Sequence, residues 1–410
     1  MPIPFYSVIW GILVYTWVCN YLIRLALSSL LPPIIQEFGL SYTSAGFLST
    51  GFFYAYMAMQ LPAGVLGDRF GRKRLLLAGV LLGAVASALT GLATSLTTLF
   101  LARLLTGLSQ GLLFSNDRVI IAATTPREKM ALGQGVSFSG PGLGTTLGLL
   151  LAGALGVVMP WRYVFFLFAL PPLLAALLLW RVVPEPPHAT AAADPAWPFR
   201  RVLRNGDFWL LGITGIMPVY VQFLLATWGP LLFSEVGITD LGRSASLASL
   251  QGVMAPVGLL LSGLIADRLH RLGMHRKVVI LAAVLMTAAS MIGMGAIIQA
   301  RGPAWLLTLC MLAASFSLWC TWGPSYAILG ELCPPSVLGK AFGLYNSTCF
   351  LGAIASPFLT GWMKDVTGSF AAGLYGVAGV SLVCAVTALA LRPAFRLAER
   401  PLAVAAPQRP

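Results

Sequence analysis

Long apolar stretches separated by short polar connections make up most of the chain. Runs of about 18 or more apolar residues recur from one end to the other, and as helices they can cross a hydrocarbon layer of about 30 Å. A helix also satisfies its own backbone hydrogen bonds in lipid. We therefore expect an all-α membrane protein with twelve transmembrane helices. The predicted spans are 6–31, 43–66, 75–94, 97–121, 133–158, 162–183, 207–234, 245–266, 278–299, 303–330, 338–362 and 370–391.

The predicted spans divide six and six around one polar connection. Residues 184–205 are rich in proline, alanine and basic residues, and the segment is too short to fold alone, which is typical of a linker. We expect an N-terminal bundle at 1–183, this cytoplasmic linker at 184–205 and a C-terminal bundle at 206–392. The tail at 393–410 has the composition of a disordered segment.

Composition and charge agree with a membrane protein. Hydrophobic residues make up 58% of the chain and charged residues 10%, against about 25% charge in soluble domains. The net charge of +13 does not indicate nucleic-acid binding, because most Lys and Arg residues gather in alternate connections. That distribution is the positive-inside pattern. It predicts an inner-membrane protein with both termini in the cytoplasm. The first apolar run is longer than that of a signal peptide and has no small-residue cleavage site, so we expect it to be retained as a helix.

The sequence offers little for catalysis or metal binding. The six cysteines lie in or beside apolar spans without CxxC spacing, and the three histidines lie in polar connections. No serine–histidine or paired-carboxylate arrangement falls within the apolar spans. We therefore expect no metal, no cofactor and no enzymatic activity.

Two arginines, Arg24 and Arg103, are the charged side chains that the pattern places deep within apolar spans. A charge at the centre of a bilayer costs at least about 2.5–3.5 kcal/mol, so such a residue usually faces a wet cavity and a partner. All 13 acidic residues fall in connections, tails or near predicted helix ends. The missing counter-charge therefore indicates a substrate that is an organic anion.

A short motif occurs once in each half, separated by about half the chain, as a duplicated six-helix unit predicts. The first copy follows the second predicted span, and the second copy follows the eighth. Its residues are Gly64, Asp68, Arg69, Gly71 and Arg72 in the first copy, and Gly263, Asp267 and Arg268 in the second.

This motif resembles the signature of the major facilitator superfamily. The resemblance implies two pseudo-symmetric six-helix bundles, a central cavity near the membrane midplane, and rocking between inward-open and outward-open states. In that family, the Asp and Arg of the motif latch the cytoplasmic side while the outside is open. The corresponding residues are Asp68 and Arg72, and Asp117 in span four is a candidate partner.

Further residues resemble the anion:cation symporter branch, whose members carry sugar acids, other carboxylates, phosphate or glutamate. By position, its substrate-anchoring arginines fall on Arg24 and Arg103, and its pocket tyrosine falls on Tyr56. The matching stretches are Asn20–Arg24, Pro32–Ser41, Gly51–Gly64, Arg103–Gln110, Trp228–Pro230, and Asn346, Gly352, Pro357 and Gly361 leading to Asp365–Ser369.

The arginines themselves support this assignment, since a guanidinium forks onto a carboxylate through two parallel hydrogen bonds. A structural role remains open for both, in which each arginine bonds backbone carbonyls and holds a helix pair together.

The chain departs from this branch where its proton-coupled members carry acidic residues. Ile23 stands at the position of the usual Asp before Arg24, and Gln110 stands at that of the usual Glu seven residues after Arg103. Neither can titrate, although Gln110 can still bond a substrate. Anion exchange, uniport, or a proton carried on the substrate all remain open. Gly140-Pro141 partly resembles an antiporter signature, which favours exchange slightly.

Candidate pocket residues in the second half are aromatic or amide side chains without a cation among them. They can stack on a substrate or bond its hydroxyls, and Trp and Tyr can equally anchor a span at the membrane interface. Because no cation faces a second carboxylate from this side, a monocarboxylate or sugar acid is favoured. These candidates are Tyr220, Trp228, Trp322, Tyr326 and Asn346.

Together these features predict a secondary or facilitative transporter of a small organic anion that functions as a monomer. Three alternatives remain open. The chain could export neutral or amphipathic compounds with structural arginines, or exchange organophosphates, although the facing arginine of such exchangers is missing. It could also be a membrane sensor that binds a ligand without transport.

Overall fold

The computed structural model describes residues 4–126, 130–186, 199–333 and 335–392. These residues form helices and connections without a β-strand. The N-terminal half contains α1 (Phe5–Phe38), α2 (Tyr42–Phe70), α3 (Arg72–Gly91), α4 (Leu96–Thr124), α5 (Met130–Val158), α6 (Trp161–Phe168) and α7 (Leu170–Val182). The C-terminal half follows the short α8 (Arg200–Leu203) and contains α9 (Gly206–Thr214), α10 (Ile216–Ser234), α11 (Leu241–Ser249), η2 (Leu250–Val253), α12 (Met254–Arg271), α13 (Lys277–Gln299), α14 (Ala304–Cys320), α15 (Trp322–Leu332), α16 (Pro335–Thr367) and α17 (Ala371–Ala390).

Each predicted span corresponds to one long helix or to consecutive shorter ones. In the described chain, ten helical stretches are long and apolar enough to cross a membrane. The two other predicted spans, 43–66 and 338–362, correspond to α2 and α16, which are long but are not among these ten stretches. These two helices pack against each other across the two halves. Because these two helices face protein as well as lipid, their composition can be less apolar.

Proline and small residues divide four of the spans into consecutive pieces. Pro171 lies in the first turn of α7, directly after the break from α6, where its missing N–H costs no helical hydrogen bond. Gly215 separates α9 from α10, and Thr321 separates α14 from α15. The 3₁₀ segment η2 joins α11 to α12. Local breaks of this kind bend a helix at an identifiable residue.

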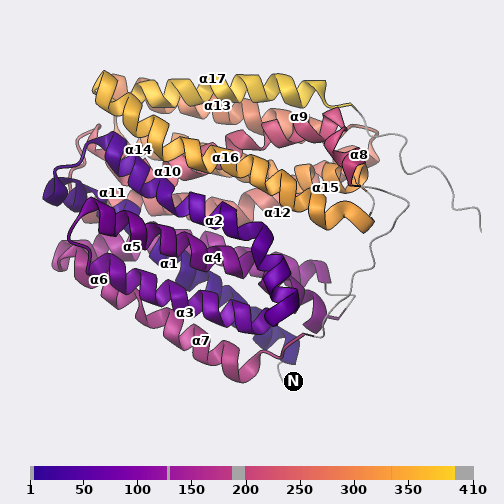
Figure 1. The fold of residues 1–410 in the computed structure, drawn as a ribbon. Helices are drawn as coiled ribbons and strands as arrows, with labels where there is room; N and C mark the ends of the chain where they lie inside the picture. The colour runs from indigo at the N-terminus through magenta and orange to yellow at the C-terminus, as the bar shows by residue number, and fades with distance from the viewer. Residues whose placement is uncertain (1–3, 127–129, 187–198, 334, 393–410) are drawn as a thin grey trace, which may run out of the picture.

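The two halves of the chain form two neighbouring groups of helices. Figure 1 shows α1–α7 in the lower part of the view and α9–α17 in the upper part, with α2 and α16 side by side along the border. The start of α1, the end of α7, the short α8 and the end of α17 lie at one face of this bundle, on the right of the view. We call this face the linker face, and the opposite face, which contains Tyr42 and Asp365, the far face.

The halves meet tightly near the far face. A Cβ atom added at Gly46 of α2 would lie 2.2 Å from the carbonyl oxygen of Pro357 in α16, and one added at Gly361 would lie 2.3 Å from that of Tyr42. The carboxylate of Asp365 accepts hydrogen bonds from the backbone N–H groups of Tyr42, at 3.0 Å, and Thr43, at 2.7 Å. A carboxylate suits a helix N-terminus, where N–H groups lack helical partners. The C-terminal half thus caps the first turn of α2, which belongs to the N-terminal half.

A second seam joins α5 to α11, η2 and α12, again across the halves. A Cβ added at Gly252 would lie 2.4 Å from the Thr146 hydroxyl oxygen and 2.8 Å from the Gly142 carbonyl oxygen. Closer to the far face, a Cβ at Gly153 would lie 2.1 Å from that of Ala245. Small residues let helix backbones approach in a membrane, where packing drives association.

Candidate substrate-binding site

A cavity of about 760 Å³ lies between the two halves. Along α2, the far-face contact at Gly46 comes first and the cavity residue Tyr56 lies further toward the linker face. Along α16, Pro357 lies in the seam and the cavity residues Phe350 and Asn346 follow in the same direction. The cavity therefore lies on the linker-face side of the closed far-face seam.

Four of the predicted pocket residues line this cavity, namely Tyr56, Trp322, Tyr326 and Asn346. The indole N–H of Trp322 is buried without a hydrogen-bond partner. An unpaired buried donor costs about 1–3 kcal/mol, so this N–H is suited to a substrate acceptor.

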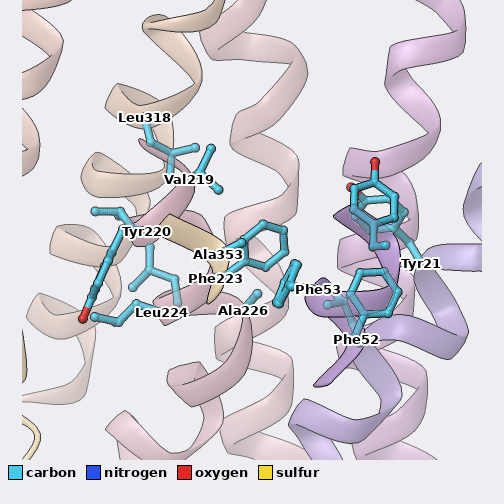
Figure 2. Packing of buried hydrophobic residues seen from close by; sticks show 14 of the residues in the cluster. Tyr21, Phe52, Phe53, Val219, Tyr220, Phe223, Leu224, Ala226, Leu318 and Ala353 are labelled. Carbon is cyan, nitrogen blue, oxygen red and sulfur yellow. The ribbon is translucent and has the colours of Figure 1, made fainter. Parts of the chain in front are cut away.

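The structure places two other candidates away from the cavity. Trp228 is fully buried, donates its indole N–H to the Pro357 carbonyl at 3.2 Å, and packs against Tyr42 and Phe370 near the far face. Tyr220 lies with its hydroxyl 3.4 Å from that of Thr360. In Figure 2 its ring points away from Phe53 and Tyr21. Both residues have packing partners in the far-face half of the molecule.

Arg24 is surrounded by rings rather than by water. Its side chain is 3% exposed, and five aromatic rings from α1, α2 and α10 lie within 6 Å of its guanidinium carbon. We call this set the aromatic cage. It consists of Phe52 at 4.3 Å, Phe223 at 4.5 Å, Tyr21 at 5.0 Å, Phe53 at 5.1 Å and Tyr56 at 5.7 Å.

The aromatic cage separates Arg24 from the cavity. Three of its members, Tyr21, Tyr56 and Phe223, also line the cavity, whereas neither Arg24 nor Arg103 does. Figure 2 shows Phe53 and Phe223 next to each other between the two halves, and their ring centres are 4.5 Å apart. The expectation that the arginines face the cavity directly is therefore wrong for this conformation, because the aromatic rings lie between.

Arg103 and Gln110 bond the backbone of α1. Arg103 donates to the carbonyl of Arg24 at 3.3 Å, and Gln110 donates to the carbonyl of Asn20 at 2.7 Å. Each side chain nevertheless keeps buried atoms without a partner, as does Arg24. These are Nε and Nη2 of Arg24, Nε and Nη1 of Arg103, and Oε1 of Gln110. Arg103 thus combines a helix-joining contact with donors left for a further acceptor, and Arg24 keeps such donors as well.

Asp117, which the sequence places near the inner end of span four, is a buried acidic side chain. Helix α4 continues to Thr124, and Asp117 within it is 1% exposed. Its carboxylate accepts from the Trp17 indole N–H at 2.7 Å and pairs with Arg118 at 3.1 Å. Arg118 also donates to the Ser137 hydroxyl at 2.7 Å. Trp17 and Arg118 line the cavity, so an ion pair lies in its wall.

Sequence reasoning missed this pair because Asp117 lies near the end of the predicted span 97–121. A signal was present, since Arg103, Gln110 and Asp117 are spaced by seven residues. Seven residues make about two helical turns, so these three side chains share one face of α4. Polar residues repeating at this spacing in an apolar helix indicate a face that contacts protein or a cavity.

The motif in the first half contacts its own half. Arg72 donates to Asn116 at 3.2 Å, and the backbone N–H of Lys73 donates to Glu185 at 3.0 Å. Gly71 adopts φ +98°, which favours glycine. Arg69 is exposed, a Cβ added at Gly64 would meet no atom within 4 Å, and the side chain of Asp68 lies outside the described residues.

In the second half, Asp267 accepts from Arg276 at 3.2 Å, and Arg276 also pairs with Glu331 of α15. Arg268 is exposed. Both copies of the motif therefore lie at the linker face, with contacts to side chains of the same half.

Comparison with known proteins identifies the family. The family model described as Major Facilitator Superfamily matches residues 13–357 and, in a second match, 239–408. The chain belongs to the major facilitator superfamily. The resemblance seen in the motif is thereby confirmed, and so is the expectation of a transporter rather than an enzyme.

Individual relatives match this superfamily member over most of its length. It is 26% identical over 407 residues to a hexuronate transporter of Bacillus subtilis, covering 94% of this chain and 96% of that protein. It is 28% identical over 340 residues to a 3-(3-hydroxy-phenyl)propionate transporter of Escherichia coli, covering 80% of each. Its fold matches the crystal structure of a D-xylose-proton symporter with a TM-score of 0.80, covering 95% and 98% of the two chains at 18% identity.

Proposed function

We propose that this transporter moves a small organic anion, and that Arg24 and Arg103 supply the positive charge that binds it. The observation that carries this proposal is a pair of guanidinium groups only 3% and 4% exposed, with N–H groups lacking acceptors. In the described chain, no ion pair links either group to an acidic side chain. An anion would supply the missing charge. The named substrates of the hexuronate and hydroxyphenylpropionate transporters are both organic anions.

The site would bind its anion after a movement of the aromatic cage. Tyr21, Tyr56 and Phe223 lie between the cavity and Arg24, and rotation of such rings would open a path of one side-chain layer. A carboxylate could then take the free N–H groups of both arginines, since Phe52 contacts both guanidinium groups. Gln110, Trp322 and Asn346 would bond the rest of the substrate.

We place the protein in the inner membrane with both termini in the cytoplasm. The positive-inside distribution of Lys and Arg supports this orientation. The linker face is then cytoplasmic, and the structure with its closed far face is an inward-facing state. In the outward-facing state, the motif residues of the linker face would latch the two halves. These residues are Gly64, Asp68, Arg69, Gly71, Arg72, Asp267 and Arg268, with Asp117 of α4 as their candidate partner.

For coupling, exchange or uniport fits the side chains at the two positions that the branch uses for protons. Ile23 is 1% exposed and has no titratable atom, and Gln110 bonds a backbone carbonyl. Loading proteoliposomes with the substrate and measuring counterflow with and without a pH gradient separates these modes. Exchange predicts uptake that depends on internal substrate, whereas uniport predicts uptake without it.

Thermal stabilisation tests the anion site. The purified protein would be melted with a panel of carboxylates, sugar acids, phosphates and neutral analogues, beside Arg24→Gln and Arg103→Gln. A ligand at 100 times its dissociation constant stabilises by about 2.7 kcal/mol. We expect a carboxylate to stabilise the wild type and neither variant. Equal stabilisation of all three proteins by a carboxylate would contradict the assignment.

One observation favours a second function, the export of amphipathic compounds. Most of the cavity lining is aromatic or aliphatic, and Arg118, which belongs to it, is paired with Asp117. Under this alternative, neutral amphipathic compounds would stabilise the wild type and both arginine variants alike, and carboxylates would have no effect.

A further inference from the structure

The walls of the cavity indicate which kind of anion fits it. Aromatic side chains make up about half of the lining residues and come from both halves, and the rest are mostly aliphatic. Apart from the tyrosine hydroxyls and tryptophan N–H groups, the lining side chains that can hydrogen-bond a substrate are Arg118, Ser139, Gln222 and Asn346. A cavity built in this way offers a substrate apolar and stacking contacts over most of its surface.

The aromatic groups continue from the cavity to the buried arginine. Phe350 of α16 lies 5.2 Å from Tyr56 and 6.2 Å from Phe223, measured between ring centres. Tyr56 and Phe223 also belong to the aromatic cage of Arg24. A planar ring placed among these three side chains would therefore have the guanidinium of Arg24 close to one end.

A polyhydroxylated body fits these surroundings poorly. Each hydroxyl buried against a ring without a partner costs about 1–3 kcal/mol, and a sugar acid brings several of them. An aromatic ring instead gains contacts with Tyr56, Phe223 and Phe350, and the ring of Phe350 is already tilted against those of the other two. The difference favours a ring over a polyol at the same distance from the arginines.

We propose that the substrate is an aryl-substituted monocarboxylate, with its ring stacked among Tyr56, Phe223 and Phe350 and its carboxylate on Arg24. This inference rests on the proposed function, since the carboxylate must bind the arginines. The buried Trp322 N–H is available to a single polar substituent on the ring.

The test compares three probes on the purified full-length protein. They are 3-phenylpropionate, its uncharged amide 3-phenylpropionamide, and glucuronate as the polyhydroxylated carboxylate. Binding is measured by thermal shift and uptake by reconstituted proteoliposomes. We expect 3-phenylpropionate to bind at least about tenfold more tightly than either of the other two.

Failure of the substrate class and failure of the anion site give different results. Glucuronate binding as tightly as 3-phenylpropionate, or more tightly, overturns the aryl class and leaves the anion site standing. Equal binding of the acid and its amide overturns the anion site itself.

A matched pair of variants on α16 tests the stacking. Phe350→Leu removes a cavity ring, and Phe358→Leu removes a more exposed ring from the same helix. We expect Phe350→Leu to weaken 3-phenylpropionate binding about three- to tenfold, with the thermal shift of each variant taken from its own ligand-free melting temperature. Phe358→Leu should leave the affinity unchanged. Equal affinities of the two variants would overturn stacking at Phe350.

Discussion

Arg24 shows at the scale of one residue how a membrane protein can hold a charge without a carboxylate beside it. Five rings present themselves to its guanidinium, and a desolvated cation–π contact can be worth about 2 kcal/mol. A cation–π contact does not use an N–H donor, and Nε and Nη2 of Arg24 remain unpartnered in the described chain. The same group can therefore contact the rings and still donate hydrogen bonds to an anion.

Replacing Arg24 by lysine tests whether the shape of the charge matters. Lysine keeps the charge but lacks the planar fork that binds a carboxylate through two bonds. We expect Arg24→Lys to weaken anion binding by about tenfold or more, measured by titration calorimetry. Arg271→Lys, at the exposed end of α12, should have no effect. Unchanged affinity in Arg24→Lys would mean that the fork does not bind the substrate.

The Asp117–Arg118 pair makes a separate prediction about stability. Asp117→Asn keeps an oxygen for the Trp17 indole but removes the charge that faces Arg118. Because Arg118 is 17% exposed in the cavity wall, water relieves part of the loss, and we expect destabilisation of about 1–3 kcal/mol. Thermal melts of Asp117→Asn, Arg118→Gln and the double variant measure the coupling between the two. Additive effects would show that the pair does not contribute.

At the scale of the helices, glycines determine how the halves close. Along the seam of α2 and α16, a Cβ atom added at Gly46 would lie 2.2 Å from the carbonyl oxygen of Pro357, which is too close for any side chain. The same pattern at Gly361 indicates that the far face closes by backbone contact. Such contacts are rigid, so a small added volume should shift the equilibrium between open and closed states.

Gly46→Leu is therefore expected to open the far face. The added Cβ would lie 2.2 Å from a backbone oxygen, and the helices must separate to admit it. Hydrogen exchange of the peptide 41–50 should become faster in this variant. Gly11→Leu in α1, where a Cβ meets no atom within 4 Å, is the control. Equal exchange in both variants would contradict closure through this glycine.

Asp365, beyond the predicted span 338–362, gives a prediction on pH. Partial burial acts to raise the pKa of this carboxyl, but hydrogen bonds from Thr43 and Tyr42 outweigh it and hold the pKa below its usual value. The stabilisation is therefore present above the ordinary pKa of about 3.9 and is lost only as pH falls through the lowered value. Asp365→Asn should lower the melting temperature equally at pH 5.5 and pH 8. A difference confined to pH 8 would contradict the lowered pKa.

At the scale of the whole molecule, closure at one face and a cavity toward the other are the features that the proposed alternating-access cycle requires of an inward-facing state. The family of the chain and the TM-score of 0.80 to a sugar symporter agree with that fold. The two halves contact each other along α2–α16 and α5–α11, which are the seams expected to part when the halves rock. Access to the cavity should therefore come from the linker face.

Thiol labelling in membrane vesicles tests this access. We expect Asn346→Cys in the cavity to react with an impermeant reagent added on the side that labels Arg200→Cys, which lies on the linker face. A reagent on the side that labels Ser41→Cys should not reach it. The wild type is the control, because its cysteines are buried or half-buried. Labelling of Asn346→Cys from the Ser41 side alone would contradict the orientation.

Much of the fold could be predicted because its determinants are local. Apolar runs of sufficient length specify where helices cross a bilayer, and Gly64–Arg72 with its echo at Gly263–Arg268 indicated the superfamily. The cavity residues Tyr56, Trp322, Tyr326 and Asn346 were also anticipated. The sequence could not show that Tyr220 and Trp228 lie outside the cavity, because an aromatic residue in a span can point toward the cavity or toward another helix.

The sequence by itself determined the helices, the two halves and the two buried arginines, since each follows from spacing and polarity along the chain. Only the tertiary structure decided what surrounds those arginines and that Asp117 meets Trp17, a hundred residues away. Such contacts depend on how each helix is rotated about its axis and against which neighbour it packs. That rotation is set by the packing of all the helices together, and therefore appears only in the folded molecule.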